Sequence, residues 1–166
     1  MSASAFETGA LANMSEFLKL SAFDAEDLDI VSAHMQDALV RVGDMKFVAG
    51  QGRFALIANR FDWLSAEGKE KGFRRRRTAV HFDRVLGVRS FKVKRTADDA
   101  VLELLSIEFM AGDLPSGKVA LNFAGGGVIE LDVECIDSGL SDLGPEWGTT
   151  SRPEHDDEGT DNEFRA

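Results

Sequence analysis

The chain has 166 residues, enough for one domain with tails, and 43% of its residues are hydrophobic, enough for an ordinary core. The net charge of −10 disfavours nucleic acid and anionic membrane as partners, since both attract positively charged surfaces. Only one cysteine is present, no apolar run is as long as a membrane helix, and no signal peptide is evident, so the sequence predicts a cytoplasmic protein.

The N-terminal part of the sequence predicts a leader, an edge strand and one helix. Residues 1–16 are small and polar, without periodicity, and are expected to be disordered. Alternation over 17–23 indicates an edge strand. Asp24 suits a helix N-cap, and Leu28, Val31 and Met35 recur at helical spacing, so a helix is predicted over 25–37.

The rest of the chain has the pattern of strands joined by turns. Strands are predicted at 39–42, 45–48, 54–63, 76–82, 85–93 and 101–110. Gly43-Asp44 is expected to form a turn or bulge, and Gly50–Gly52 a hairpin turn. Residues 65–72 read as a polar loop. Asp83-Arg84 is interpreted as the turn of a hairpin that pairs 76–82 with 85–93.

The clearest pattern lies in Val119–Cys135. In its second half Ile129, Leu131, Val133 and Cys135 alternate with three acidic residues, which predicts a strand with one buried and one exposed face. The Gly125–Gly127 triplet is expected to be the turn before it. Residues 140–147 form a short closing segment, and from 148 to 166 six acidic residues face two arginines, which predicts a disordered acidic tail.

Together these elements predict one β-rich domain over 17–147 with an α+β fold. We expect a mostly antiparallel meander of about eight strands, arranged as two packed sheets or a half-open barrel, with the helix covering an open face. A pleckstrin-homology-like barrel is the alternative. The helix predicted here comes early, whereas that fold closes with a C-terminal helix.

Several strings in order resemble a known family. They are Gln36-Asp37, Val40–Asp44, Arg53–Leu56, Asn59–Trp63, Arg75–Thr78, His81–Arg84, Phe123–Gly127, Val133–Cys135 and Asp142–Gly144. They are similar to an alphaproteobacterial domain-of-unknown-function family, the one numbered twenty-nine forty-eight. The resemblance covers about residues 17–147 and implies an uncharacterised bacterial cytoplasmic protein. It brings no functional residues with it.

A basic run is the sharpest local charge feature. Arg74, Arg75, Arg76 and Arg77 follow Lys69 and Lys71 and could bind phosphate or an acidic partner. The alternative is structural, with the arginines paired to the acidic face of residues 130–134 or to the acidic tail. The negative net charge and the lack of interleaved aromatic residues favour this structural interpretation.

A second polar group centres on His81, with Asp83 next to it and Arg60 and Asp62 as further candidates. With Asp62 or Asp83 beside it, His81 could act as a general base. Because no nucleophile or second acid is evident, the residues favour a structural interpretation, a strand histidine next to a turn aspartate with arginine–aspartate pairs that hold neighbouring strands in register. No residue pattern indicates a catalytic set, a metal site or a cofactor site.

These observations leave the biochemical function unknown and favour a non-enzymatic protein over an enzyme. The leading hypothesis is a binding or interaction module that self-associates through a sheet edge or an apolar face, or binds a protein partner. A phosphate- or anion-binding module that uses Arg74–Arg77 is the second hypothesis. An enzyme with an acid–base site centred on His81 is the third.

Overall fold

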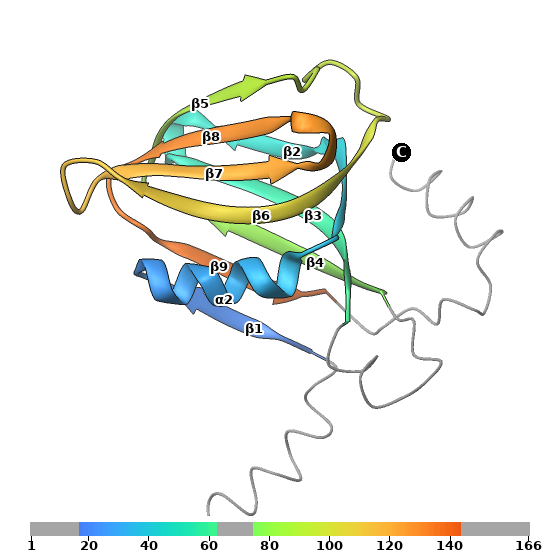
Figure 1. Ribbon diagram of the computed structural model, residues 1–166, viewed down its shortest axis with the longest axis horizontal. Coiled ribbons are helices and arrows are strands. Elements are labelled where there is room, and N and C mark those ends of the chain that lie inside the picture. The colour runs from blue at the N-terminus through green and yellow to red at the C-terminus, as the bar shows by residue number, and fades with distance from the viewer. Residues whose placement is uncertain (1–16, 63–74, 144–166) are drawn as a thin grey trace, which may run out of the picture.

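The computed structural model describes residues 17–62 and 75–143. In this part of the chain it shows one α-helix and nine antiparallel strands in a single sheet, which confirms the α+β class (Figure 1). The predicted leader, the polar loop over 65–72 and the acidic tail over 148–166 lie outside the described residues.

The sheet has the strand order β1-β9-β4-β3-β2-β6-β7-β8-β5, so β1 and β5 form its two margins. The elements are β1 (Lys19–Ala22), α2 (Ala25–Met35), β2 (Leu39–Val48), η1 (Ala49–Gln51), β3 (Arg53–Phe61), β4 (Arg75–Phe82), β5 (Val85–Phe91), β6 (Val101–Ala111), β7 (Gly117–Phe123), η2 (Ala124–Gly126), β8 (Val128–Val133) and β9 (Ser138–Asp142).

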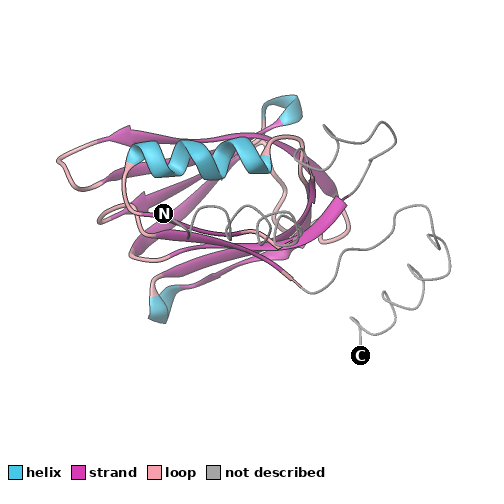
Figure 2. Ribbon diagram, turned by 90° about the horizontal axis from the view of Figure 1, so that it is seen from below, coloured by secondary structure: helices cyan, strands magenta, loops and turns pink. Residues whose placement is uncertain are grey.

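The predicted helix is confirmed as α2. The Asp24 carboxylate accepts a hydrogen bond from the Asp27 N–H at 2.8 Å, so the expected N-cap is in place. Leu28, Val31 and Met35 form its buried face. The helix packs against β6 and β1 and lies across the open side of the curled sheet (Figure 2). In the described residues no helix is long and apolar enough to span a membrane.

The alternation in the second half of Val119–Cys135 gives the predicted faces. Ile129, Leu131 and Val133 in β8 are buried, and β8 pairs with β7 across the glycine turn. Cys135 does not follow the pattern, because β8 ends at Val133 and the cysteine is partly exposed beyond it. The apolar row of β8 therefore contributes directly to the core.

Strand β2 joins the two parts of the sheet. Its first residues, Leu39 and Val40, pair with β3 on one side and with β6 on the other, whereas Met45–Val48 pair with β3 alone. The register shifts between Val40 and Met45, which confirms the bulge predicted at Gly43-Asp44. The second half of the sheet, from β6 through β7 and β8 to β5, is therefore attached to the first half by the beginning of β2.

The predicted hairpin between 76–82 and 85–93 is wrong. β4 pairs with β3 and β9, whereas β5 pairs with β8. The corner between them is held by other segments: the Asp83 N–H donates to the Asp137 carbonyl at 2.8 Å and the Val85 N–H donates to the Gly52 carbonyl at 2.9 Å. Arg84 has a positive φ of 62°, which redirects the chain. The same bond from Val85 brings the start of β5 back to η1, so the sheet is curled into a half-open barrel.

The predicted closing segment is the ninth strand, β9, one more than the expected eight. Leu140 in β9 is buried, as expected, and β9 pairs with β4 on one side and β1 on the other. The rest of the predicted segment, 144–147, lies outside the described residues. β9 is thus an inner strand, and the short β1 forms the margin.

Candidate functional site

The free side of β5 is the first feature of the described residues that could bind a partner. β5 pairs with β8 only, with a register shift between Val85 and Gly87. Leu86 is 65% exposed and Phe91 51% exposed, whereas Val88 packs against the core. A terminal strand of this kind offers unpaired backbone groups and apolar side chains side by side.

The ladder between β7 and β8 shows which backbone groups of β5 point to the free edge. The Phe123 N–H donates to the Gly127 carbonyl at 2.8 Å. Because hydrogen-bonded and non-hydrogen-bonded pairs alternate along an antiparallel ladder, the N–H and C=O groups of β8 point to β7 at residues 129, 131 and 133. At residues 128, 130 and 132 they point to β5. By the same alternation, Val88 and Ser90 turn their N–H and C=O groups away from β8.

Two surface depressions meet at Leu86. A polar one of about 640 Å³ lies between η1 and the start of β5 and includes Arg53, Asp83, Arg84 and Glu134. A more apolar one of about 410 Å³ lies beside the β6–β7 turn and includes Met110 and Val133. In the polar depression, the hydrogen bond from Arg53 lowers the pKa of Asp83 and raises that of Arg53. Both depressions are open, and together they place exposed apolar and charged groups next to the margin of the sheet.

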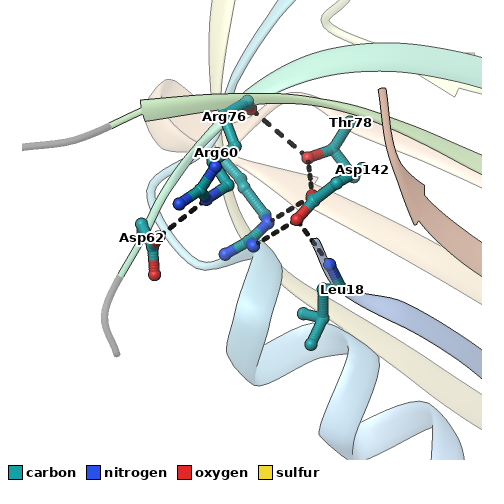
Figure 3. A network of polar contacts seen from close by, with 6 residues as sticks. All are labelled: Leu18, Arg60, Asp62, Arg76, Thr78 and Asp142. Carbon is teal, nitrogen blue, oxygen red and sulfur yellow. Dashed lines mark hydrogen bonds and ion pairs between the residues drawn. The ribbon is translucent and has the colours of Figure 1, made fainter. Parts of the chain in front are cut away.

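A buried ionic cluster lies at the other end of the curled sheet (Figure 3). Arg60 donates from Nε and Nη2 to the two carboxylate oxygens of Asp142 at 2.9 and 2.8 Å. Asp142 also accepts from the Thr78 hydroxyl at 2.7 Å and from the Leu18 N–H at 2.7 Å. The side chains of Arg60 and Asp142 are only 2% and 1% exposed. Asp142, in β9, therefore connects β3 and β4 with the residue just before β1.

A second buried pair completes the cluster. Arg76 Nε donates to Asp62 Oδ2 at 2.7 Å, and the two side chains are 2% and 0% exposed. His34, from the last turn of α2, is half-buried, and the charges of Arg60, Asp142 and Asp62 act on its pKa. Burial lowers the pKa of His34, and the Arg60 cation lowers it further. With two arginines facing two aspartates, the four ion-paired groups balance in charge.

The surroundings of Asp142 have opposing effects on its pKa. Burial by itself raises the pKa, because it disfavours the charged form. Hydrogen bonds from Arg60, Leu18 and Thr78 outweigh burial and hold the pKa of Asp142 below its ordinary value of 3.8. The carboxylate is thus kept ionised, and its four hydrogen bonds fit an anchor for the sheet.

The structure divides the predicted basic run between the two faces of β4. Arg76 points inward to Asp62, whereas Arg75 donates to the Asn59 carbonyl at 3.2 Å and lies over the Phe61 ring at 5.7 Å from its centre. Arg77 is partly buried, and Arg74 lies outside the described residues. The acidic face of β8 takes other partners: Glu130 pairs with Arg89 at 2.6 Å, and Lys118 lies near Glu130 and Asp132.

His81 lies on the outer face of β4, away from the buried cluster. Its Nε2 is 3.7 Å from Asp83 Oδ2, beyond hydrogen-bond distance, and its side chain is 38% exposed. Asp62 is on the inner face with Arg76, so the structure brings only Asp83 near His81. His81 and Arg60, both named as candidates from sequence, thus belong to separate surroundings. In the described residues, no group of His, Cys, Asp and Glu has the arrangement of a metal site.

A glycine beside His81 gives the first testable prediction. In the register of β4 and β9, Gly139 is opposite His81, and a Cβ at Gly139 would be 2.5 Å from His81 Cε1. We expect Gly139→Ala to lower the free energy of unfolding by about 0.5–1.5 kcal/mol, measured by urea denaturation, because the partly exposed His81 ring must turn away from the new methyl group. His81→Ala in the same chain should restore most of the loss. No gain from the second substitution would contradict a clash with this side chain.

Sequence reasoning missed Asp142, Thr78 and the amide of Leu18. Their only signal was weak: Thr78 and Arg76 share one face of a strand, and Asp142 comes two positions after the apolar Leu140. The described residues define an α+β protein with one curled antiparallel sheet, an ionic cluster inside one end and a free strand at one margin. The chain belongs to the family described as Protein of unknown function (DUF2948), whose model matches residues 18–155. No curated protein and no solved structure matches significantly.

Proposed function

We propose that this protein is an interaction module that associates with a second copy of itself through the free edge of β5. The observation that supports it is the combination of free backbone groups at Val88 and Ser90 with the exposed side chains of Leu86 and Phe91. Edge strands that do not serve in pairing are usually protected by charge or by a cover. On β5 the one charged side chain, Arg89, is engaged with Glu130 in the neighbouring strand.

The other two hypotheses have less support from the geometry. An anion site on the basic run would need its arginines on one surface, and Arg76 is instead buried against Asp62. An acid–base site at His81 would need a carboxylate within hydrogen-bond reach in a hollow, and His81 is absent from the lining of both described depressions. Neither arrangement offers a place where a substrate would be enclosed.

The association can be tested with a charge on the edge strand. We expect Phe91→Glu to weaken self-association of the full chain by about tenfold or more, because it places a carboxylate in the centre of an apolar contact. Sedimentation velocity over a range of protein concentrations gives the dissociation constant. The matched control is Leu105→Glu, on β6, where a leucine is 44% exposed away from β5.

The control should keep the dissociation constant of the unmodified protein. Equal weakening by both substitutions would show that general charge, and not the β5 edge, governs association. A wild-type chain that stays monomeric at the highest concentration would overturn the proposed function itself.

A further inference from the structure

The structure also limits how two copies can pair, and the inference that follows rests on the proposed function. The start of β5 is closed to a partner strand, because the Val85 N–H, which points to the free edge, already donates to Gly52 at 2.9 Å. η1 occupies the place that a partner strand would need next to Val85. Only Gly87–Phe91 of β5 can therefore pair with a strand of a second copy.

The alternation of side chains between the two faces of β5 excludes half of the pairing registers that η1 leaves open. Beyond the register shift, Val88 and Ser90 lie on the core side, and Gly87, Arg89 and Phe91 on the outer side, as the contact of Arg89 with Glu130 shows. Directly opposed residues of an antiparallel pair lie on the same face. A symmetric pair must therefore centre on a residue, not between two residues.

Five centres satisfy this condition within Gly87–Phe91, and an axis at either end of this run, Gly87 or Phe91, would pair only one residue of each copy. A two-fold axis at Val88 would place Phe91 of the second copy opposite Val85, where η1 is in the way. An axis at Ser90 would pair only the last residues of the strand. An axis at Arg89 pairs 87–91 with 91–87 of the second copy and uses the outward backbone groups of Val88 and Ser90.

We propose that two copies pair through Gly87–Phe91 with the two-fold axis at Arg89. In this register Phe91 of each copy lies opposite Gly87 of the other. The outer side of Gly87 has room for a ring: a Cβ there would have only Asp132 Oδ2 nearby, at 3.9 Å. Leu86, 65% exposed, lies beside Gly87 and extends the apolar contact. Two identical contacts form, one on each side of the axis.

Repulsion between like charges on the two copies opposes this pairing, so the strength of association should depend on the salt concentration. The two Arg89 side chains face each other across the axis, and each copy has a net charge of −10. Each Arg89 keeps its own carboxylates, Glu130 at 2.6 Å and Asp132 at 3.7 Å, which reduces the local repulsion. Because the long-range term is repulsive, association should strengthen as the salt concentration rises.

Single cysteines locate the axis. In a full-length chain with Cys135→Ser, we compare Arg89→Cys with Val88→Cys and Ser90→Cys under mild oxidation. With the axis at Arg89, the two Cα atoms of residue 89 are about 4.5 Å apart, within disulfide range. Residues 88 and 90 of one copy are about 7–8 Å from their counterparts, beyond that range. We expect Arg89→Cys to form disulfide-linked dimer about tenfold more efficiently than either control.

The possible results distinguish an error in the position of the two-fold axis from an absence of self-association. Each variant is first measured in reducing buffer by sedimentation velocity, where all three should associate and Arg89→Cys should associate more tightly, since the facing charges are gone. Preferential cross-linking of Val88→Cys or Ser90→Cys would overturn the axis at Arg89 and leave the proposed edge pairing in place. Association without cross-linking at any of the three would overturn both proposals. No association in reducing buffer would overturn the proposed function.

Discussion

Replacing Asp142 by alanine is expected to lower the free energy of unfolding by about 3–5 kcal/mol, measured by urea denaturation at pH 7. The substitution removes both hydrogen bonds from Arg60 and leaves that guanidinium, 2% exposed, as an uncompensated buried charge. It also removes the acceptor of the Leu18 N–H and so loosens β1. The cost is large because burial prevents water from replacing the lost carboxylate.

The matched control is Asp83→Ala. Asp83 also pairs with an arginine, Arg53, at 2.7 Å, but both side chains are partly exposed. Such pairs contribute about 0–1 kcal/mol, because water replaces the missing partner. Equal losses from the two substitutions would contradict the assignment of Asp142 as a buried anchor.

The effect of Asp142→Ala should also depend on pH. The pKa of Asp142 is lower in the folded chain than its ordinary value of 3.8, so its contribution is fully present above that value. As the pH falls through the folded pKa, the contribution is lost. Wild-type protein should therefore lose more stability in acid than the variant does, and the difference between them should shrink below about pH 4.

Leu131→Ala is expected to lower the free energy of unfolding by about 2–5 kcal/mol, by the same measurement. Leu131 is 0% exposed and stands in the middle of the inner face of β8, so the substitution leaves a cavity in the core. The control is Asp132→Ala, one position along the same strand on the outer face, which should change stability by about 0.5 kcal/mol or less. A small effect at Leu131 would show that this row does not pack in the core.

These two residues also show what the sequence could predict. Alternation assigns each side chain of a strand to a face, so Leu131 was correctly expected to be inside and Asp132 outside. The N-cap at Asp24 likewise depends on residues within one turn of the helix. Both features are local, and local patterns are what a single sequence carries.

Pairing between distant segments could not be predicted in the same way. The short turn at Asp83-Arg84 favoured a hairpin between the strands beside it. Instead, the Asp83 and Val85 N–H groups donate to the carbonyls of Asp137 and Gly52, which are distant in sequence, and these bonds redirect the chain. Asp142 and Arg60 are 82 positions apart. An alternation with a period of two shows which way a side chain points, but it does not show which strand lies beside it. Contacts between distant segments could therefore be identified only from the three-dimensional structure.

The basic run shows the same difference at the candidate site. Four consecutive arginines look like one charged surface in the sequence, but along a strand neighbours point to opposite sides. Arg76 therefore lies inside with Asp62, and Arg75 packs outside on Phe61. The strand that was expected to pair beside this run, β5, is instead the free margin.

The hydrogen bond from Val85 to Gly52 has a consequence for misassembly. It takes a donor away from one margin of the sheet, while the other margin, β1, has only four residues. Short margins give a growing amyloid fibril little template, since each added strand needs a long run of open backbone groups. Aggregation of this protein on heating should therefore follow global unfolding rather than precede it, and turbidity should not rise before the thermal transition.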